Sequence, residues 1–232
     1  MNQISTFYLD LFRNKEPLDF TKWFSNTLIV AIFTCIISSF IIISVSYALS
    51  RLRFKYRKKM MNIALVLGMF PGFLSMIAIY YVLKALDLTN SLVSLVLVYS
   101  ASAGLNYYIA KGFFDTIPRA LDEAAILDGA SRFKIFINIT IPLSKPIMVY
   151  TVLTSFLAPW VDFIFASMIA KGNQDMFTVA VGLYKMIDRE TIYNYFTRFC
   201  AGGVLIGISI SALFMYMQKY YVEGISSGSV KS

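Results

Sequence analysis

The feature that most constrains this chain is the length of its apolar blocks. Five stretches of about 20 residues carry few charges, and a helix of that length crosses the hydrocarbon core of a bilayer. Of the 232 residues, 58% are hydrophobic and 15% are charged, whereas soluble domains are roughly 45–50% apolar. A soluble core made from these blocks would need several helices without a polar face. The sequence therefore predicts an all-α, polytopic transmembrane helical bundle.

The apolar blocks divide the chain into spans, loops and two terminal segments. We expect about five spans, at residues 26–50, 60–83, 91–110, 145–170 and 198–218. The segments outside them are residues 1–25, a polar loop at 111–144, a second loop at 171–197 and a Gly/Ser-rich tail at 219–232. Pro71-Gly72 interrupts the second span and predicts a kink, which serves either as a gate or only to fit a curved bundle.

The basic residues predict the orientation of the bundle. Residues 51–59, the first polar loop with Lys145, and the tail together hold 13 of the 21 Lys and Arg residues. Such residues favour the cytoplasmic side, so the first polar loop and the tail are expected inside. Residues 1–25 and the 171–197 loop are expected outside. A translocated N-terminus without a signal peptide predicts either a missing upstream span, which we favour, or insertion that depends on a partner.

Several classes of function are excluded by composition. The net charge of +8 gathers beside the ends of the apolar blocks, which is typical of a membrane protein and not of a nucleic-acid-binding one. The chain has no histidine, so His-dependent catalysis and His-ligated metals are excluded. Cys35 and Cys200 lie far apart in apolar segments and are interpreted as small core residues. We predict no catalytic residue and no metal site.

The first polar loop predicts two short helices. Pro118 suits the first turn of a helix that ends near Asp128, with Thr116 or Asp115 as its cap. Gly129 is a natural helix stop, because it permits a left-handed turn. The first helix would present small Ala side chains to a partner. An amphipathic hairpin lying on the membrane is the alternative, but such elements are usually rich in Lys and Arg, so protein docking is the better interpretation.

A second, apolar-rich helix is predicted from Phe133 to Ile139, and Pro142 is expected to end it. Taken as a whole, the first polar loop resembles the EAA signature of permease subunits in ABC importers. The matching residues are Glu123, Ala124, Ala125, Asp128, Gly129, Ala130, Phe136, Ile139 and Pro142. The resemblance implies a coupling helix that docks in a cleft of a cytoplasmic ATPase. Because the chain has no phosphate-binding loop of the G-x-x-x-x-G-K-[ST] type, ATP and Mg²⁺ are expected on partner subunits, with no cofactor on this chain.

The resemblance covers about residues 7–232 and points to carbohydrate importers, most closely the MalG-like maltose/maltodextrin type. The segments that carry it are Trp23–Thr27, Tyr47–Phe54, Pro159–Phe163, Phe177–Tyr184 and the ending from Gln218, with Gly228, Ser229, Val230 and Lys231. It implies a type I importer permease fold of six spans, of which this chain lacks the first.

The family also implies partners and a location. They are two ATPase subunits, a second, different permease subunit, an extracellular sugar-binding protein at the 171–197 loop, and membrane lipid, with no nucleic acid. The tail residues Gly228 to Lys231 are expected to contact the ATPase. The chain would be a multi-pass protein of the bacterial plasma membrane, and substrate contacts lie mainly on the partner permease in this family.

Four residues within the spans have two interpretations each. Asp162 lies near the outer boundary and either lines the pathway or caps a helix after Pro159. Trp160 either stacks on a sugar ring or anchors the chain at the interface. Gly203 and Gly207 form a G-x-x-x-G that packs either within the chain or against a partner permease.

The alternative function is a secondary transporter or channel that needs no ATPase. Such proteins usually carry several buried ionisable residues for ion coupling. The predicted spans hold almost none apart from Asp162. The sequence therefore favours the ATP-driven importer.

Overall fold

The computed structural model describes residues 11–12, 18–101, 104–190 and 192–229, and every element in these ranges is helical. The α-helices are α2 (Phe20–Arg51), α3 (Arg57–Gly68), α4 (Gly72–Ala85), α5 (Leu92–Ala101), α6 (Gly104–Thr116), α7 (Arg119–Leu127), α8 (Arg132–Ile135), α9 (Ile141–Leu143), α10 (Lys145–Val161), α11 (Ile164–Ala170), α12 (Val179–Met186) and α13 (Ile192–Ser229). A π-helical turn, Phe136–Thr140, joins α8 to α9, and a 3₁₀ turn, Gln174–Met176, precedes α12. The prediction of an all-α bundle is confirmed.

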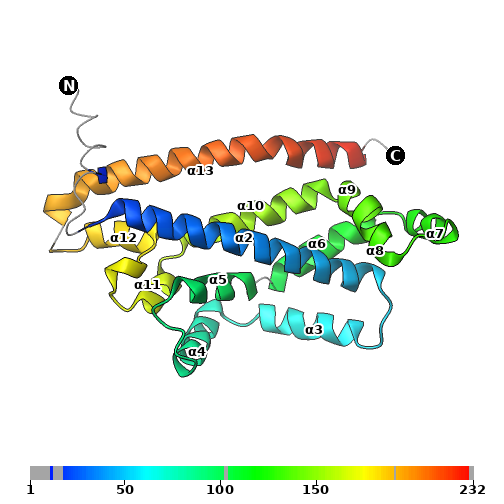
Figure 1. The fold of residues 1–232 in the computed structure, drawn as a ribbon, viewed down its shortest axis with the longest axis horizontal. Helices are drawn as coiled ribbons and strands as arrows, with labels where there is room; N and C mark the ends of the chain where they lie inside the picture. The colour runs from blue at the N-terminus through cyan, green and yellow to red at the C-terminus, as the bar shows by residue number, and fades with distance from the viewer. Residues whose placement is uncertain (1–10, 13–17, 102–103, 191, 230–232) are drawn as a thin grey trace.

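Helix α2 is the central element of the bundle. It packs on α5, α6, α10 and α12, and α2, α10 and α13 run along the long axis of the molecule (Figure 1). Helices α7 and α8 lie at one end of this axis, and α11 and α12 lie at the other. The end of α13 lies toward the α7 end, so the start of α2 and the end of α13 are at opposite ends of the molecule.

The buried side chains form two clusters along α2. The larger one lies toward the α12 end and includes Phe20, Trp23 and Phe165; the smaller one lies near α7 and includes Ile42 and Phe114. Small polar residues line the buried face of α2 between them, which lets neighbouring helices approach closely. Ser38 on α2 and Ser155 on α10, for example, have their hydroxyl oxygens 3.2 Å apart.

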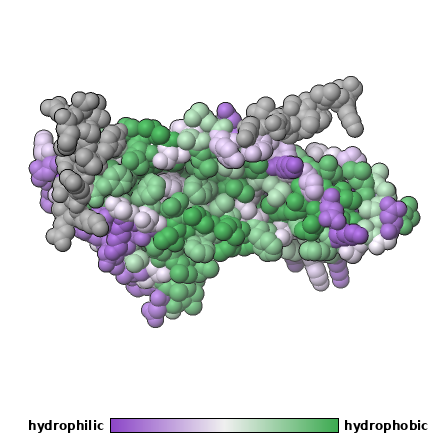
Figure 2. All heavy atoms as spheres, turned by 45° about the horizontal axis from the view of Figure 1, so that its top comes forward, coloured by the Kyte–Doolittle hydropathy of each residue, from purple (hydrophilic) through white to green (hydrophobic). Residues whose placement is uncertain are grey.

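Two described helices are long and apolar enough to cross a membrane, Phe20–Arg51 and Ile192–Gln218, and the number rises to five if each sharply bent helix pair is one span. The bends measure 101° between α3 and α4, 43° between α5 and α6, and 81° before α10. The predicted kink at Pro71-Gly72 is thus a turn of more than 90°. Figure 2 shows a broad hydrophobic surface over the middle of the molecule, as expected for a bundle that faces lipid.

Two helix boundaries differ from the expectation. Helix α10 ends at Val161, with Pro159 in its last turn, and α11 begins a new direction at Ile164. The 171–197 segment contains the partly buried α12 and the start of α13. The segment begins with a tight turn, in which Lys171 and Gly172 have φ values of 47° and 81°.

Candidate functional site

The site that the sequence singled out is the short helix α7 at one end of the bundle (Figure 1). Pro118 precedes it, and no side chain caps its first turn. The predicted caps are wrong, because Thr116 donates its hydroxyl to the Phe113 carbonyl and Asp115 binds Ser50 and Lys111.

The stop that the sequence predicted after α7 is confirmed. Gly129 has a φ of 77°, a conformation that costs residues with a Cβ about 1–2 kcal/mol. Its N–H donates to the Ile126 carbonyl, and the Ala130 N–H donates to the Ala125 carbonyl at 2.9 Å. This pair of bonds is the Schellman motif that ends many helices.

A buried ion pair attaches α7 to the bundle. Arg51, the last residue of α2, has its Nη1 3.3 Å from Oδ2 of Asp122 on α7, and the two side chains are only 2% and 9% exposed. Its Nη2 donates to the carbonyls of Phe114 and Ile117, each at 2.7 Å. One guanidinium therefore joins the end of α2, the end of α6 and the first turn of α7. Sequence reasoning missed this pair, because it considered Arg51 as a positive-inside residue and as part of the segment Tyr47–Phe54, and assigned it no partner.

A second set of polar contacts supports the same junction. Ser50 donates to Oδ1 of Asp115 at 2.6 Å, and Lys111 donates to its other carboxylate oxygen. Burial alone would raise the pKa of Asp115, but the hydrogen bonds from Lys111 and Ser50, with the charges of Lys111 and Arg57, outweigh it and lower the pKa. Asp115 is thus held as a carboxylate between α2 and α6.

The two faces of α7 differ. Asp122 is buried, whereas Ala120 and Ala124 are exposed and Leu127 is 89% exposed at the end of the helix. An apolar side chain that projects fully from a short helix, beside small residues, suits insertion into a partner's cleft. Glu123 lies on the flank, where it lines a cavity beside the end of α2.

The second predicted helix of the loop is present but divided. It begins at α8, where Ser131 accepts a hydrogen bond from the Lys134 N–H at 3.3 Å, and Ile139 lies in the π-helical turn that follows. Pro142 does not end the helix, because it lies in the first turn of α9, where a missing N–H costs nothing. The break comes at Ser144, where the chain turns by 81° into α10.

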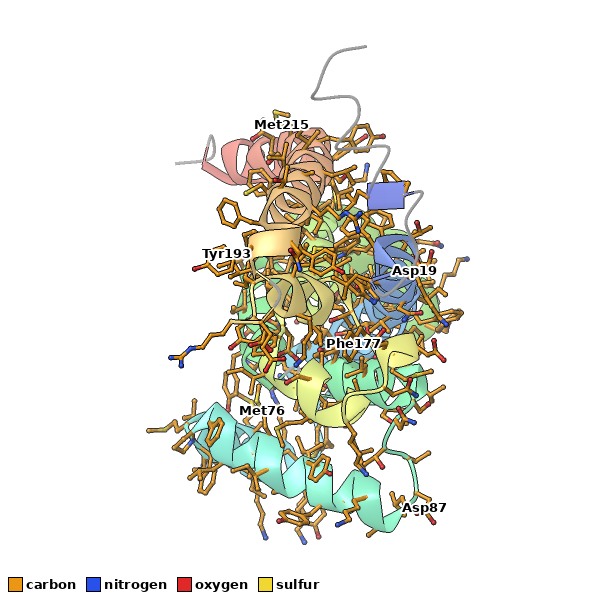
Figure 3. The ribbon with its side chains drawn as sticks, turned by 90° about the vertical axis from the view of Figure 1, so that its left-hand side faces the viewer. Asp19, Met76, Asp87, Phe177, Tyr193 and Met215 are labelled. Carbon is orange, nitrogen blue, oxygen red and sulfur yellow. The ribbon has the colours of Figure 1, made fainter. Side chains whose placement is uncertain are left out.

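At the opposite end of the bundle, two segments that the sequence treated separately form one joint. Asn26 on α2 donates to the Asp175 and Phe177 carbonyls at 2.8 and 3.0 Å. Thr27 accepts a hydrogen bond from the Val179 N–H at 2.8 Å, which satisfies a free donor in the first turn of α12. Viewed from this end of the bundle, Phe177 lies near the middle of the molecule, whereas Asp87 and Met215 lie at its periphery (Figure 3).

The structure places Asp162 in the break between α10 and α11. Its Oδ1 accepts from the Phe165 N–H at 3.1 Å, and its Oδ2 accepts from the Tyr99 hydroxyl at 2.6 Å. The hydrogen bond from the Phe165 N–H supports the interpretation of Asp162 as a helix cap. Trp160 is 6% exposed and packs edge-on against Phe24, with ring centroids 5.2 Å apart. It lies in the core, which differs from both roles considered for it.

Gly203 and Gly207 face open space, because a Cβ on either would meet nothing within 4 Å. Packing within the described part of the chain is therefore not their role. The neighbouring Gly202 is the tightly packed one, since a Cβ there would lie 2.9 Å from Leu183 and 3.0 Å from Phe20.

Two further expectations concern the tail and metal binding, and the described residues cover each of them only in part. In the tail, Gly228 and Ser229 belong to α13, and Val230 and Lys231 lie outside the described residues. Within the described ranges, no group of three His, Cys, Asp or Glu residues is arranged to hold a metal ion.

Comparison with known proteins gives this arrangement a family. The profile described as "Binding-protein-dependent transport system inner membrane component" matches residues 40–227. The chain is 36% identical over 225 residues to the galactooligosaccharides transport system permease protein GanQ of Bacillus subtilis (strain 168). The aligned residues cover 97% of this chain and 79% of GanQ. It is 35% identical over 210 residues to the maltodextrin transport system permease protein MalD of Streptococcus pneumoniae, covering 90% and 74%.

The fold also has a counterpart among solved structures. A chain in the crystal structure of a bacterial ABC transporter involved in the import of the acidic polysaccharide alginate matches with a TM-score of 0.78 and 21% identity. The match covers 93% of this chain and 79% of that chain. At this identity the likeness concerns the fold alone.

The chain belongs to the family of inner membrane components of binding-protein-dependent transport systems. It is an ABC transporter permease subunit, a multi-pass protein of the cell membrane and not an enzyme. ATP is bound by partner ATPases, and a binding protein is part of such a system. The resemblance to the carbohydrate class that the sequence carried is confirmed.

Proposed function

We propose that this chain is one of two permease subunits of an oligosaccharide importer, and that α7 receives the movement of an ATPase subunit. The other members would be two ATPase subunits, a second, different permease and an extracellular sugar-binding protein. In this proposal residues 111–144 and the tail are cytoplasmic, and the 171–197 segment is extracellular. The excess of basic residues on the first side supports this orientation.

The observation that carries the proposal is the Arg51–Asp122 pair. Force applied to the exposed face of α7 passes through this buried contact into the end of α2 and of α6. Helix α2 has 32 residues, so it extends about 48 Å at 1.5 Å per residue. Its far end holds α12 through Thr27 and the turn before α12 through Asn26. One continuous helix thus joins the ATPase side to the side where sugar would arrive, as rigid-body alternation of access requires.

Site-specific crosslinking tests the docking of α7. In a Cys35→Ala/Cys200→Ala background, Ala124→Cys is expected to form a crosslink with an ATPase subunit in intact cells, because its side chain is small and exposed. Gln174→Cys is the matched control, since it is exposed at the opposite end of the bundle. Crosslinking of Gln174→Cys instead of Ala124→Cys would reverse the proposed orientation, and the absence of an ATPase in both would refute the coupling role.

The substrate is proposed from the relatives. GanQ and MalD are permeases for galactooligosaccharides and maltodextrin, respectively, at nearly equal identity. We therefore propose a short oligosaccharide as substrate, of the maltodextrin or the galactooligosaccharide class. Uptake of labelled maltotriose and of a labelled galactotriose by cells with and without this permease decides between them. If deletion of the permease leaves the uptake of both sugars unchanged, the proposed substrate class is refuted.

A further inference from the structure

Beside the end of α2 the structure has an open cavity of about 640 Å³. The proposed coupling uses only its Arg51–Asp122 wall. It lies between the segment that follows α2 and the flank of α7. Its lining combines four arginines, two carboxylates and three apolar side chains: Arg51, Arg53, Arg119, Arg132, Asp122, Glu123, Leu52, Phe54 and Ile126. The arginines come from three different parts of the chain, so the fold, and not a local basic run, brings them together.

We propose that this cavity binds the phosphate headgroup of an anionic phospholipid from the cytoplasmic leaflet. The inference rests on the proposed orientation of the bundle. Arg51 and Asp122 neutralise each other across 3.3 Å. Arg53, Arg119 and Arg132 remain, and among the described residues none of these three forms an ion pair. Glu123 is the one other carboxylate of the lining, so the cavity has an excess of positive charge.

The residue types fit a phosphate. A guanidinium group is planar and always charged, and its paired N–H donors match two phosphate oxygens at once. Arg53, Arg119 and Arg132 are exposed. Arg119 donates one long hydrogen bond to the Ser50 carbonyl at 3.5 Å, and its other N–H groups can turn toward a ligand, as can those of Arg53 and Arg132. Arg51 is held in place by Asp122, and its Nε is a buried donor without a hydrogen-bond partner among the described residues.

The position and the apolar lining favour a lipid over a free phosphate. Arg51 is the last residue of a 32-residue helix of membrane-spanning character, so the cavity lies where that span leaves the bilayer. Phe54 and Ile126 are 39% and 40% exposed in the lining, and they offer contact for the glycerol and the first acyl carbons. Basic pockets between membrane helices on the cytoplasmic side are a common form of lipid headgroup site. The cavity also lies off the exposed face of α7, which leaves that face free for the ATPase.

Lipid binding to the purified, complete transporter tests the proposal. The probe is phosphatidylglycerol, titrated against phosphatidylcholine and followed by native mass spectrometry. Arg53→Gln/Arg132→Gln is expected to weaken phosphatidylglycerol binding by about tenfold or more. Lys55→Gln/Lys58→Gln is the matched control, because it removes the same charge from exposed positions near Arg53 that do not line the cavity. The control is expected to change binding less than about twofold.

The remaining outcomes each decide a different point. Equal weakening by both double variants would mean attraction by general surface charge and would overturn the cavity. Displacement of the lipid by millimolar inorganic phosphate, with phosphate alone retained, would assign the cavity to a free anion and overturn the lipid. If the Arg53→Gln/Arg132→Gln variant purifies without the ATPase subunits, the cavity binds an acidic segment of that partner, and the lipid proposal is overturned. A failure of the proposed function is distinguishable from a failure of the lipid proposal, because the unmodified chain would then purify without an ATPase.

Discussion

Gly182 on α12 lies directly against the indole of Trp23 on α2: a Cβ on this glycine would stand 2.0 Å from Cε3 of the ring. The two residues are 159 positions apart, and each belongs to a segment that the sequence connected with carbohydrate importers. Their contact joins the two segments: with the hydrogen bond to Thr27 it fixes α12 on the end of α2, and Asn26 holds the turn that precedes α12.

Gly182→Ala is expected to destabilise the transporter, because the added methyl group must displace a fully buried Trp23. Overpacking of this kind costs about 1–3 kcal/mol. The measurement is the thermal stability of the purified complex by size-exclusion chromatography after heating. Gly112→Ala on α6 is the control, since its Cβ would meet nothing within 4 Å. If the two variants melt alike, α12 does not pack on α2 as described.

Arg51→Met is expected to loosen α7 from the bundle. It leaves Asp122 as a buried charge without a partner, a change that costs about 3–5 kcal/mol. Arg51→Met/Asp122→Leu should recover part of this loss, because no unpaired charge remains. Protease cleavage between residues 117 and 131 measures the effect, and the single variant should be cut faster than the double one. Equal cleavage of wild type and Arg51→Met would show that the pair does not hold α7.

Gly129→Asp is expected to uncouple uptake from ATP hydrolysis. A side chain at φ 77° is strained by about 1–2 kcal/mol, so the end of α7 should change direction while the buried Asp122 side holds. Assembly should remain largely intact, ATPase activity should persist and sugar uptake should fall. A Glu123→Gln variant should show the same pattern if that carboxylate contacts the ATPase. Uptake at the wild-type level in Gly129→Asp would remove the basis for the coupling assignment.

Tyr99→Phe is expected to weaken the junction of α5 with the α10–α11 break. The substitution deletes the donor that Oδ2 of Asp162 accepts at 2.6 Å, and hydrogen bonds to charged groups are worth about 1.5–3 kcal/mol. The melting temperature of the purified complex should fall. Tyr81→Phe serves as the control, because that side chain is 63% exposed. No difference between the two would argue against the Tyr99–Asp162 contact.

Deletion of residues 224–232 tests the proposed contact of the tail. The truncated permease is expected to reduce ATPase activity or the yield of the assembled transporter. Substitution of Cys200 by Ala, in the first third of α13, is a control for general effects on that helix. Wild-type activity together with a wild-type yield would rule out the tail as an ATPase contact.

Local chemistry explains why some predictions succeeded. The stop at Gly129 depends on one residue's tolerance of positive φ, and the break at Pro71-Gly72 depends on a missing N–H. Both effects act within one helical turn. The capping of α7 was predicted wrongly because Asp115 and Thr116 had other partners within reach, and Ser50, the partner of Asp115, is 65 residues away.

The membrane-spanning helices, the loop with α7 and the family were determined by the sequence itself, because hydrophobic length, helix-stopping residues and the EAA pattern are properties of short segments. Only the tertiary structure decided that Arg51 holds Asp122, that Trp23 receives Gly182, and that Trp160 is buried. It also decided that Gly202, and not Gly203 or Gly207, packs within the chain. Such pairings depend on how helices cross, and a crossing is set by the summed packing of both faces and not by either segment alone.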